Sequence, residues 1–400
     1  MPKRAGALAL RPPRVLLALG TVSLALAASV GPPSAAAEPA DAVSAISLVE
    51  QRVIEIPDSR LLSLSPDGGS IAVTRPAGGD ADQLCIHDSE TLAERACADV
   101  GDLDAHLWIE SVVWSLDSRW LAFAELWPQY FSDGDLWLMD ASTGGLTNLL
   151  DDAITLPQHP TFTPDSAAVT FSRTVVQDGE HHGADIATVP VTGGDAVGLG
   201  GSMRGPTDYY GLHWTADGSR LYALVVHHQG QEYGPDSGIW LYQADAMNAR
   251  QLVSAADLDH GLESIVAATS GGEQLLVRWG MPLDRKPIDR FALVDGDSGA
   301  VEPITSLRPK ARRSKPIIAA TLSPAGALVL TVSGRRGRQV AVRDVAGLHE
   351  TILLNEERGD APSSLSHVST WAQNDTVLIL GGGWGRGTLL VLDRGDRSGG

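Results

Sequence analysis

The chain has 400 residues, of which 43% are hydrophobic and 20% are charged, and its formal net charge is −19. This composition is that of a globular protein, and the strong acidity argues against nucleic acid or anionic membrane surfaces as partners. Glycine is abundant, at 43 residues, while helix-length amphipathic patterns are few. The combination favours short strands joined by turns.

The first 37 residues have the composition of a secretory signal peptide. An apolar segment (15–30) precedes the small residues Ala35, Ala36 and Ala37. The basic residues in front of it are Lys3, Arg4, Arg11 and Arg14. We therefore predict a cleaved signal peptide (1–37), a linker (38–50) and export to the periplasm, the cell envelope or the exterior, with no integral membrane segment after cleavage. An uncleaved membrane anchor is the alternative, because the apolar segment is nearly long enough to span a bilayer.

The two cysteines predict a disulfide. Cys85 and Cys97 flank the turn-prone segment 88–94, so they can face each other across adjacent antiparallel strands. Export would place them in an oxidising compartment. Such a crosslink stabilises by about 3 kcal/mol on the loop-entropy model. Two separate buried thiols, or a metal site, fit this spacing less well.

One pattern recurs along the chain at intervals of 48 to 54 residues. It is an apolar residue, a four-residue turn such as Ser-Pro-Asp-Gly, and then a strand-like run. The turns occupy 65–68, 115–118, 163–166 and 215–218, with degenerate copies at 269–272, 323–326 and 372–375. Proline presets φ, while Asp and Gly tolerate the remaining turn conformations. The aspartates are therefore expected to form turns and not to act in catalysis.

Each unit contains four strand-like runs, and a period near 50 with four strands is typical of a β-propeller blade. The last unit ends after its third strand (387–394), whereas an additional strand (51–56) precedes the first turn. We therefore predict an all-β, seven-bladed propeller over 51–394, closed by strand 51–56 joining the last blade, and a C-terminal tail (395–400). Closure would remove exposed sheet edges.

The turns, the apolar residue before them and third strands such as DLWLMD (135–140) resemble TolB-type, WD-like propeller repeats. The same repeats occur in propellers of prolyl-oligopeptidase-like peptidases. The resemblance implies an exported protein that binds other proteins through a propeller face or through the mouth of the central channel. A peptidase is not expected here, because the chain has no Gly-x-Ser-x-Gly motif.

The long, irregular connections should gather on one face, opposite the short turns, and function usually lies on such loops. The predicted partner-binding residues on that face are Trp127, Tyr130, Tyr209, Tyr210, Tyr233, Arg285, Arg312, Arg313 and Arg336. They would form a rim that is acidic and aromatic in blades two to four and basic in blades five to seven. Such a rim could dock a protein partner or a glycan.

Two pairs of adjacent histidines are candidate metal ligands: His181, His182, His227 and His228. We expect them in equivalent loops of neighbouring blades, with Glu180 and Glu232 nearby, where they could bind zinc or another divalent metal. Adjacent loop histidines that simply face water are the alternative.

The sequence favours a non-enzymatic exported scaffold, for which no cofactor is expected. A metal-dependent propeller enzyme, similar to a lyase or a lactonase and using the histidine-rich and acidic loops, is the alternative.

Overall fold

The computed structural model describes the chain between residues 48 and 394, with gaps. The described ranges are 48–57, 61–78, 81–100, 108–109, 112–126, 135–150, 155–177, 180–203, 207–229, 232–243, 249–255, 262–279, 291–304, 317–323, 326, 328–333, 339–345, 350–355, 365–371, 377–381 and 386–394. The predicted signal peptide and C-terminal tail lie outside them. No helix in these ranges is long and apolar enough to cross a membrane.

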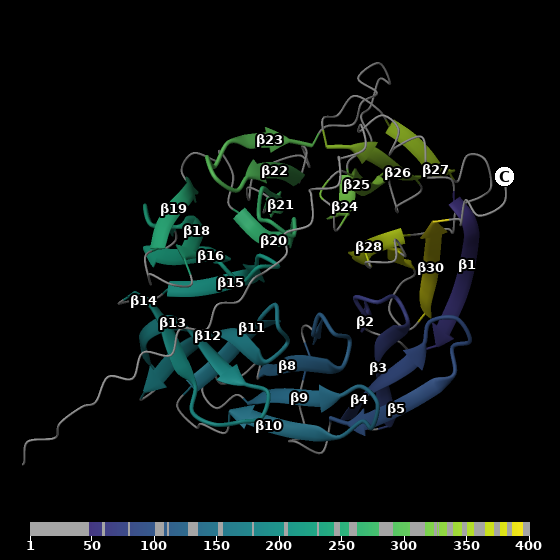
Figure 1. Ribbon diagram of the computed structural model, residues 1–400, viewed down its shortest axis with the longest axis horizontal. Helices are drawn as coiled ribbons and strands as arrows, with labels where there is room; N and C mark the ends of the chain where they lie inside the picture. Colours follow the sequence, from purple (N-terminus) through teal and green to yellow (C-terminus); the bar gives the residue numbers. More distant parts are fainter. Residues whose placement is uncertain are drawn as a thin grey trace, which may run out of the picture. The chain divides into compact units, whose positions relative to one another are not determined.

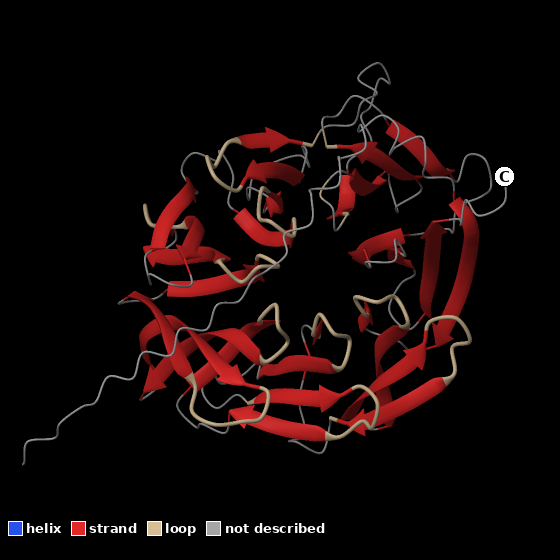
Figure 2. Ribbon diagram, viewed as in Figure 1, coloured by secondary structure: helices blue, strands red, loops and turns tan. Residues whose placement is uncertain are grey.

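Every described element is a β-strand, and in the described ranges the strands form seven antiparallel sheets (Figures 1 and 2). All belong to one unit of the chain, Glu38–Gly400. Blade 1 contains β2 (Leu61–Leu64), β3 (Ser70–Gly78), β4 (Ala81–Asp88) and β5 (Glu94–Asp99). Blade 2 contains β6 (Trp108–Ile109), β7 (Val113–Trp114), β8 (Trp120–Leu126), β9 (Leu136–Asp140) and β10 (Leu146–Leu150).

The next blades repeat this order. Blade 3 contains β11 (Thr155–Phe162), β12 (Ala168–Gln177), β13 (Glu180–Pro190) and β14 (Val197–Met203). Blade 4 contains β15 (Thr207–Trp214), β16 (Arg220–Gln229), β17 (Glu232–Tyr233), β18 (Gly238–Gln243) and β19 (Ala249–Ser254). Blade 5 contains β20 (Leu262–Ala268), β21 (Gln274–Trp279), β22 (Phe291–Asp295) and β23 (Val301–Pro303).

Two sheets remain. Blade 6 contains β24 (Ile317–Leu322), β25 (Leu328–Ser333), β26 (Gln339–Asp344) and β27 (Glu350–Asn355). The sheet that we call the terminal sheet contains β28 (Leu365–Trp371), β29 (Val377–Gly381), β30 (Arg386–Arg394) and β1 (Leu48–Pro57). In it, the first described strand pairs with the last, for example Val53 opposite Leu390. The predicted all-β propeller of four-stranded antiparallel blades is confirmed, with one additional short strand in two of them: in blade 2 both β6 and β7 pair with β8, and in blade 4 the short β17 also pairs with β16.

The first strands of successive sheets lie next to one another. Contacts link β2 to β7, β7 to β11, β11 to β15, β15 to β20, β20 to β24, β24 to β28 and β28 to β2. Two tryptophans support these junctions. Trp114 Nε1 donates to the carbonyl of Ser63 in blade 1, and Trp214 Nε1 donates to Thr170 Oγ1 in blade 3. Both occupy the apolar position that precedes the turn in the repeat.

The hydrophobic core lies between neighbouring blades. One cluster joins Leu84 and Ile86 of blade 1 to Leu121 and Phe123 of blade 2. Corresponding clusters join blades 2 and 3, blades 3 and 4, blades 4 and 5, and blades 5 and 6. Because side chains alternate across a strand, blades 2 to 5 bury residues on both faces. A blade therefore requires its neighbours to complete its core.

The predicted disulfide is confirmed. Cys85 in β4 lies directly opposite Cys97 in β5, and their sulfurs are bonded. The crosslink therefore joins the two outer strands of blade 1.

The predicted role of the turn aspartates is also confirmed. In blade 2, the Ser115 hydroxyl donates to Asp117 Oδ1 over 2.5 Å and accepts the N–H of Trp120 over 2.8 Å. The same two bonds occur around Ser65, Thr163 and Thr215. Asp117 Oδ1 also accepts the N–H of Arg119. The aspartate is thus engaged in holding its own turn.

Candidate functional site

Most of the predicted binding residues lie outside the described residues. This holds for Trp127, Tyr130, Arg285, Arg312, Arg313 and Arg336. Their assignment to a partner-binding face therefore stays a prediction.

The expectation that Tyr209 is an exposed binding aromatic is wrong. Its side chain is 1% exposed and packs in the core between blades 3 and 4 with Ile186 and Leu221. Tyr209 belongs to β15, so the alternation of that strand directs it between the sheets. Tyr210, the next residue, is partly buried and packs against the core between blades 4 and 5. Only the backbone of Tyr233 is described, in β17 opposite His228.

The histidine pairs lie in strands, and the expectation of equivalent loops is wrong. His181 and His182 are near the start of β13, the third strand of blade 3. His227 and His228 are near the end of β16, the second strand of blade 4. The first pair therefore follows the second-to-third connection of blade 3, whereas the second pair precedes the corresponding connection of blade 4. Metal binding by these residues stays a prediction, since the described side chains include only His227.

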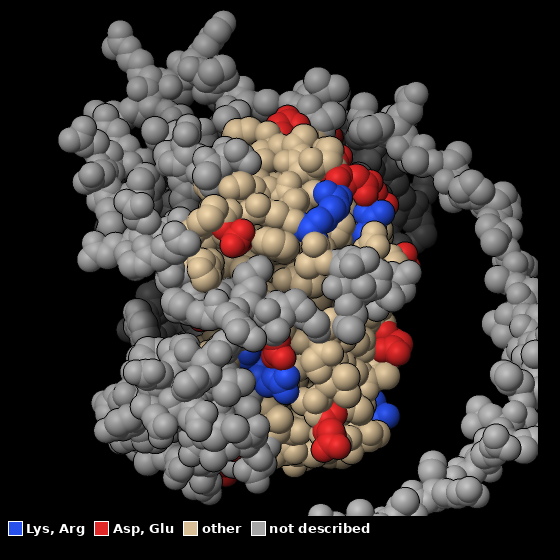
Figure 3. All heavy atoms as spheres, turned by 90° about the vertical axis from the view of Figure 1, so that its left-hand side faces the viewer, with Lys and Arg blue, Asp and Glu red and all other residues tan. Residues whose placement is uncertain are grey.

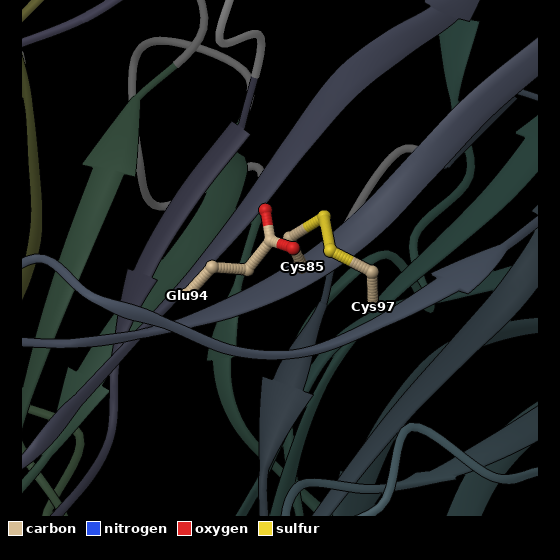
Figure 4. Close-up of side chains that lie close together, drawn as sticks. All are labelled: Cys85, Glu94 and Cys97. Carbon is tan, nitrogen blue, oxygen red and sulfur yellow. A yellow bond between two sulfur atoms is a disulfide. The ribbon is translucent and has the colours of Figure 1, made fainter.

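Among the described residues, one group of metal-ligating side chains has its ligand atoms within 4.8 Å of one another: Cys85, Glu94 and Cys97. Figure 4 shows the Glu94 carboxylate beside the disulfide. Because the two sulfurs are bonded to each other, neither is a thiolate that could ligate a metal. Glu94 also pairs with Arg75 over 2.9 Å. This group is a structural crosslink with an adjoining ion pair.

A polar cluster that the sequence did not reveal lies between the first strands of blades 3 and 4. The ring of His159 in β11 lies 4.7 Å from that of Tyr210 in β15, at an interplanar angle of 52°. The Tyr210 hydroxyl donates to Asp208 Oδ2 over 3.3 Å. His159 has φ of 49°, in the left-handed region that non-glycine residues seldom adopt. Strained residues of this kind cluster at functional sites, which makes this group a candidate.

Burial determines the protonation of this cluster. Desolvation lowers the pKa of His159 from its usual 6.5 to about 4, although the charge of Asp208 opposes the shift. Desolvation also lowers the pKa of His213, whose Nε2 lies 3.1 Å from the carbonyl oxygen of Ile265 in blade 5. Both imidazoles are therefore neutral at pH 7. A neutral imidazole beside a phenol and a carboxylate can exchange hydrogen bonds with a polar ligand, but the cluster contains no nucleophile of the Ser-His or Cys-His kind.

A faint sequence signal could have revealed His159. It lies three residues before Phe162, and Gly211 lies three residues before Trp214 in the next repeat. Both positions fall at an irregularity in strand pairing, and Gly211 also has a positive φ, of 53°. A histidine at a position that carries glycine in the next repeat therefore marks an unusual backbone.

The described surface of blades 3 and 4 carries charges of both signs. Figure 3 shows basic and acidic side chains in small adjacent groups on the side that carries β13, β14, β18 and β19. Two ion pairs in this region are Arg173 with Asp185, within blade 3, and Arg220 of blade 4 with Asp297 of blade 5, each with a nitrogen–oxygen distance of 2.6 Å. The predicted division of the loop rim into an acidic half and a basic half involves residues outside the described part of the chain, so it stays a prediction.

Solved structures share this fold. The β-propeller domain of Cps50 (Swd1) from Myceliophteria thermophila aligns with a TM-score of 0.54 and 14% identity over 86% of this chain and 99% of that chain. A chain from a structural and mechanistic analysis of two prolyl endopeptidases aligns with a TM-score of 0.56 and 14% identity over 81% of this chain and 46% of that chain. The present chain thus matches about half of the prolyl endopeptidase. No family model and no curated protein sequence matches it.

These likenesses establish the fold. The chain is a β-propeller.

Proposed function

We propose that this chain is a non-enzymatic, exported propeller scaffold that binds a protein partner through the face formed by its second-to-third connections and the connections between blades, which we call the long-loop face. On this proposal the terminal sheet is the seventh blade, closed by β1, and the protein is of the TolB type. The pairing of β1 with β30 and the contact of β2 with β28 support closure.

The observation that carries the proposal is the difference between the two sets of connections. The first-to-second turns all have the same length; they are residues 65–69, 115–119, 163–167, 215–219, 269–273 and 323–327. By contrast, the second-to-third connections range from residues 79–80 and 178–179 to residues 127–135 and 280–290. Uniform turns serve the fold, whereas variable loops on a rigid scaffold usually carry recognition. The two solved neighbours share the fold only, which by itself is a weak indication of function.

The basic and apolar composition of residues 1–37 supports export. N-terminal sequencing of the protein recovered from the producing cell should begin after Ala37. Recovery of intact residues 1–37 in a membrane fraction would replace export with anchoring.

The binding face can be tested by a matched pair of charge reversals. In one variant Arg312 and Arg313 are changed to Glu, and in the other Arg95 and Arg119, which lie on the turn side of blades 1 and 2. Each variant changes the net charge by the same amount, so general electrostatic effects cancel. Proteins captured from cell-envelope extract are quantified by mass spectrometry. We expect the first variant to lose a partner that the second retains.

Equal capture by both variants would contradict the use of the long-loop face. Circular dichroism of both variants shows whether the propeller is intact.

A further inference from the structure

A second surface lies at the opposite ends of the strands, on the first-to-second turns of blades 1 to 3. The second residue of each turn is apolar: Pro66, Leu116 and Pro164. Proline is favoured at this turn position because it presets φ, but leucine has no such advantage. Leu116 is nevertheless 44% exposed. In the described part of the chain, it and Val197 are the exposed large hydrophobic side chains. The turn itself does not explain this leucine.

Hydrogen bonds join the three turns into one surface. The N–H of Asp67 in blade 1 donates to Ser118 Oγ in blade 2 over 3.2 Å, and the N–H of Asp117 donates to Ser166 Oγ in blade 3 over 3.2 Å. We call the resulting surface the turn strip; its members are Pro66, Asp67, Leu116, Asp117, Pro164 and Asp165. Because each turn is held internally and to its neighbour, a ligand would bind a preorganised surface and order little of it.

The turn strip is negatively charged. Asp67, Asp117 and Asp165 are exposed, and each uses Oδ1 to accept the backbone N–H two residues later. Hydrogen bonds from the Thr163 hydroxyl and the Ala167 N–H lower the pKa of Asp165, which keeps this carboxylate charged. The basic residue in these turns, Arg119, lies 4.3 Å from the centre of the Trp120 ring and 3.9 Å from Asp140 Oδ2. The strip therefore combines apolar side chains with an excess of negative charge.

We propose that the turn strip binds a short segment of a partner protein in which basic and apolar residues alternate. Carboxylates would attract the basic residues, and Leu116 between the two prolines would contact the apolar ones. The same carboxylates repel phosphate groups, so the chemistry favours a polypeptide over nucleic acid or an anionic membrane. This surface is on the opposite side from the long-loop face and does not depend on the function proposed for that face.

The test uses the full chain and an eight-residue synthetic peptide of alternating lysine and leucine, with binding measured by fluorescence anisotropy. Leu116→Ser introduces the residue that blade 5 carries at this position, Ser270. Val197→Ser is the matched control, because it makes an equivalent change at the other exposed hydrophobic residue. We expect Leu116→Ser to weaken binding roughly tenfold, as loss of a buried leucine contact predicts, and Val197→Ser to leave it unchanged.

Two further arms make the result decisive. Leu116→Lys adds repulsion and should weaken the lysine–leucine peptide further, and a glutamate–leucine peptide should not bind. The proposal is overturned by absence of binding of the lysine–leucine peptide, by equal effects of Leu116→Ser and Val197→Ser, or by equal binding of the two peptides. The Arg312→Glu/Arg313→Glu variant should bind the lysine–leucine peptide as the original chain does. Failure of the proposal for the long-loop face can therefore be distinguished from failure of the proposal for the turn strip.

Discussion

In the first-to-second turns of blades 1 to 4 and of blades 5 and 6, the first residue makes the same two backbone hydrogen bonds, but the side-chain support differs. In the first group the initial Ser or Thr donates to an aspartate two residues later, as Thr215 does to Asp217 over 2.6 Å. In blade 5 the Thr269 hydroxyl donates instead to Glu273 over 2.8 Å. In blade 6 the residue at the position of the aspartate, two residues after Ser323, is Ala325. The aspartate is therefore replaceable within this fold.

The hydroxyl at the start of the turn is what both groups share. It accepts the N–H of the sixth residue in blade 5 and in blade 6, just as in the first four blades. Ser65, Ser115, Thr215, Thr269 and Ser323 are all buried. A buried N–H without a partner is costly, so the hydroxyl that accepts it has few substitutes. The carboxylate, near the surface, adds to a turn that is already closed.

The largest expected effect concerns a feature of blade 1, its disulfide. Replacing Cys85 and Cys97 with Ala should lower the free energy of unfolding by about 3 kcal/mol, because the unfolded chain regains the entropy of a closed loop. Urea unfolding of the original chain and the double variant measures this difference. The single variant Cys97→Ala should lose about as much, and an unchanged urea midpoint would contradict the prediction.

A smaller effect should separate the two groups of turns. Ser115→Ala removes the acceptor for the Trp120 N–H and the donor to Asp117, and should cost about 2 kcal/mol. Ser323→Ala removes the acceptor for the Leu328 N–H, from a turn with alanine at the aspartate position, and should cost about half as much. Both are measured by urea unfolding. Equal losses would mean that the aspartate adds nothing to the turn.

The turn aspartates of blades 1, 3 and 4, whose pKa values are lowered, should also make these blades sensitive to acid. Hydrogen bonds from Thr215 and Ser219 lower the pKa of Asp217 from 3.8 to about 2. Because the folded pKa lies below the unfolded one, the stabilisation is complete above about pH 4 and is lost as the pH falls towards 2. Asp217→Asn should therefore be less stable at pH 7 and show a smaller further loss between pH 4 and pH 2.

The measurement is the urea midpoint at several pH values. Asp195→Asn is the matched control, because it removes an exposed aspartate that lies outside these turns. If both variants have the same pH dependence, the charge of Asp217 does not support its turn.

The elements that repeat were predictable from the sequence, because each is decided locally. The Ser-Pro-Asp-Gly pattern specifies a turn, and its period specifies the blade. Cys85 and Cys97 were predictable too, since a hairpin places residues on either side of a turn opposite each other. These predictions needed no information about how one blade meets the next.

The direction of individual side chains, which depends on how each strand pairs with its neighbour, was not predictable. Tyr209 and Tyr210 are adjacent and chemically alike, yet the first is core and the second lies against His159. The alternation of β15 determines which is which, and a pairing irregularity between Tyr210 and His213 shifts that alternation. The expectation that the histidine pairs lie in loops was wrong for a related reason, since strands β13 and β16 extend further than their apolar pattern suggests.

The smallest expected effect concerns the fourth residue of the turn, where blades 2 and 3 have serine and blades 1 and 4 have glycine. Ser118 has φ of 59°, which is strained for any residue with a side chain. Its hydroxyl accepts the N–H of Asp67 from blade 1, which offsets that strain. Ser118→Ala keeps the strain and loses the hydrogen bond, so it should cost about 1 kcal/mol. Ser118→Gly loses the same bond but relieves the strain, so stability should change little. Urea unfolding of both variants compares them directly, and equal stability would show that backbone strain at Ser118 is negligible.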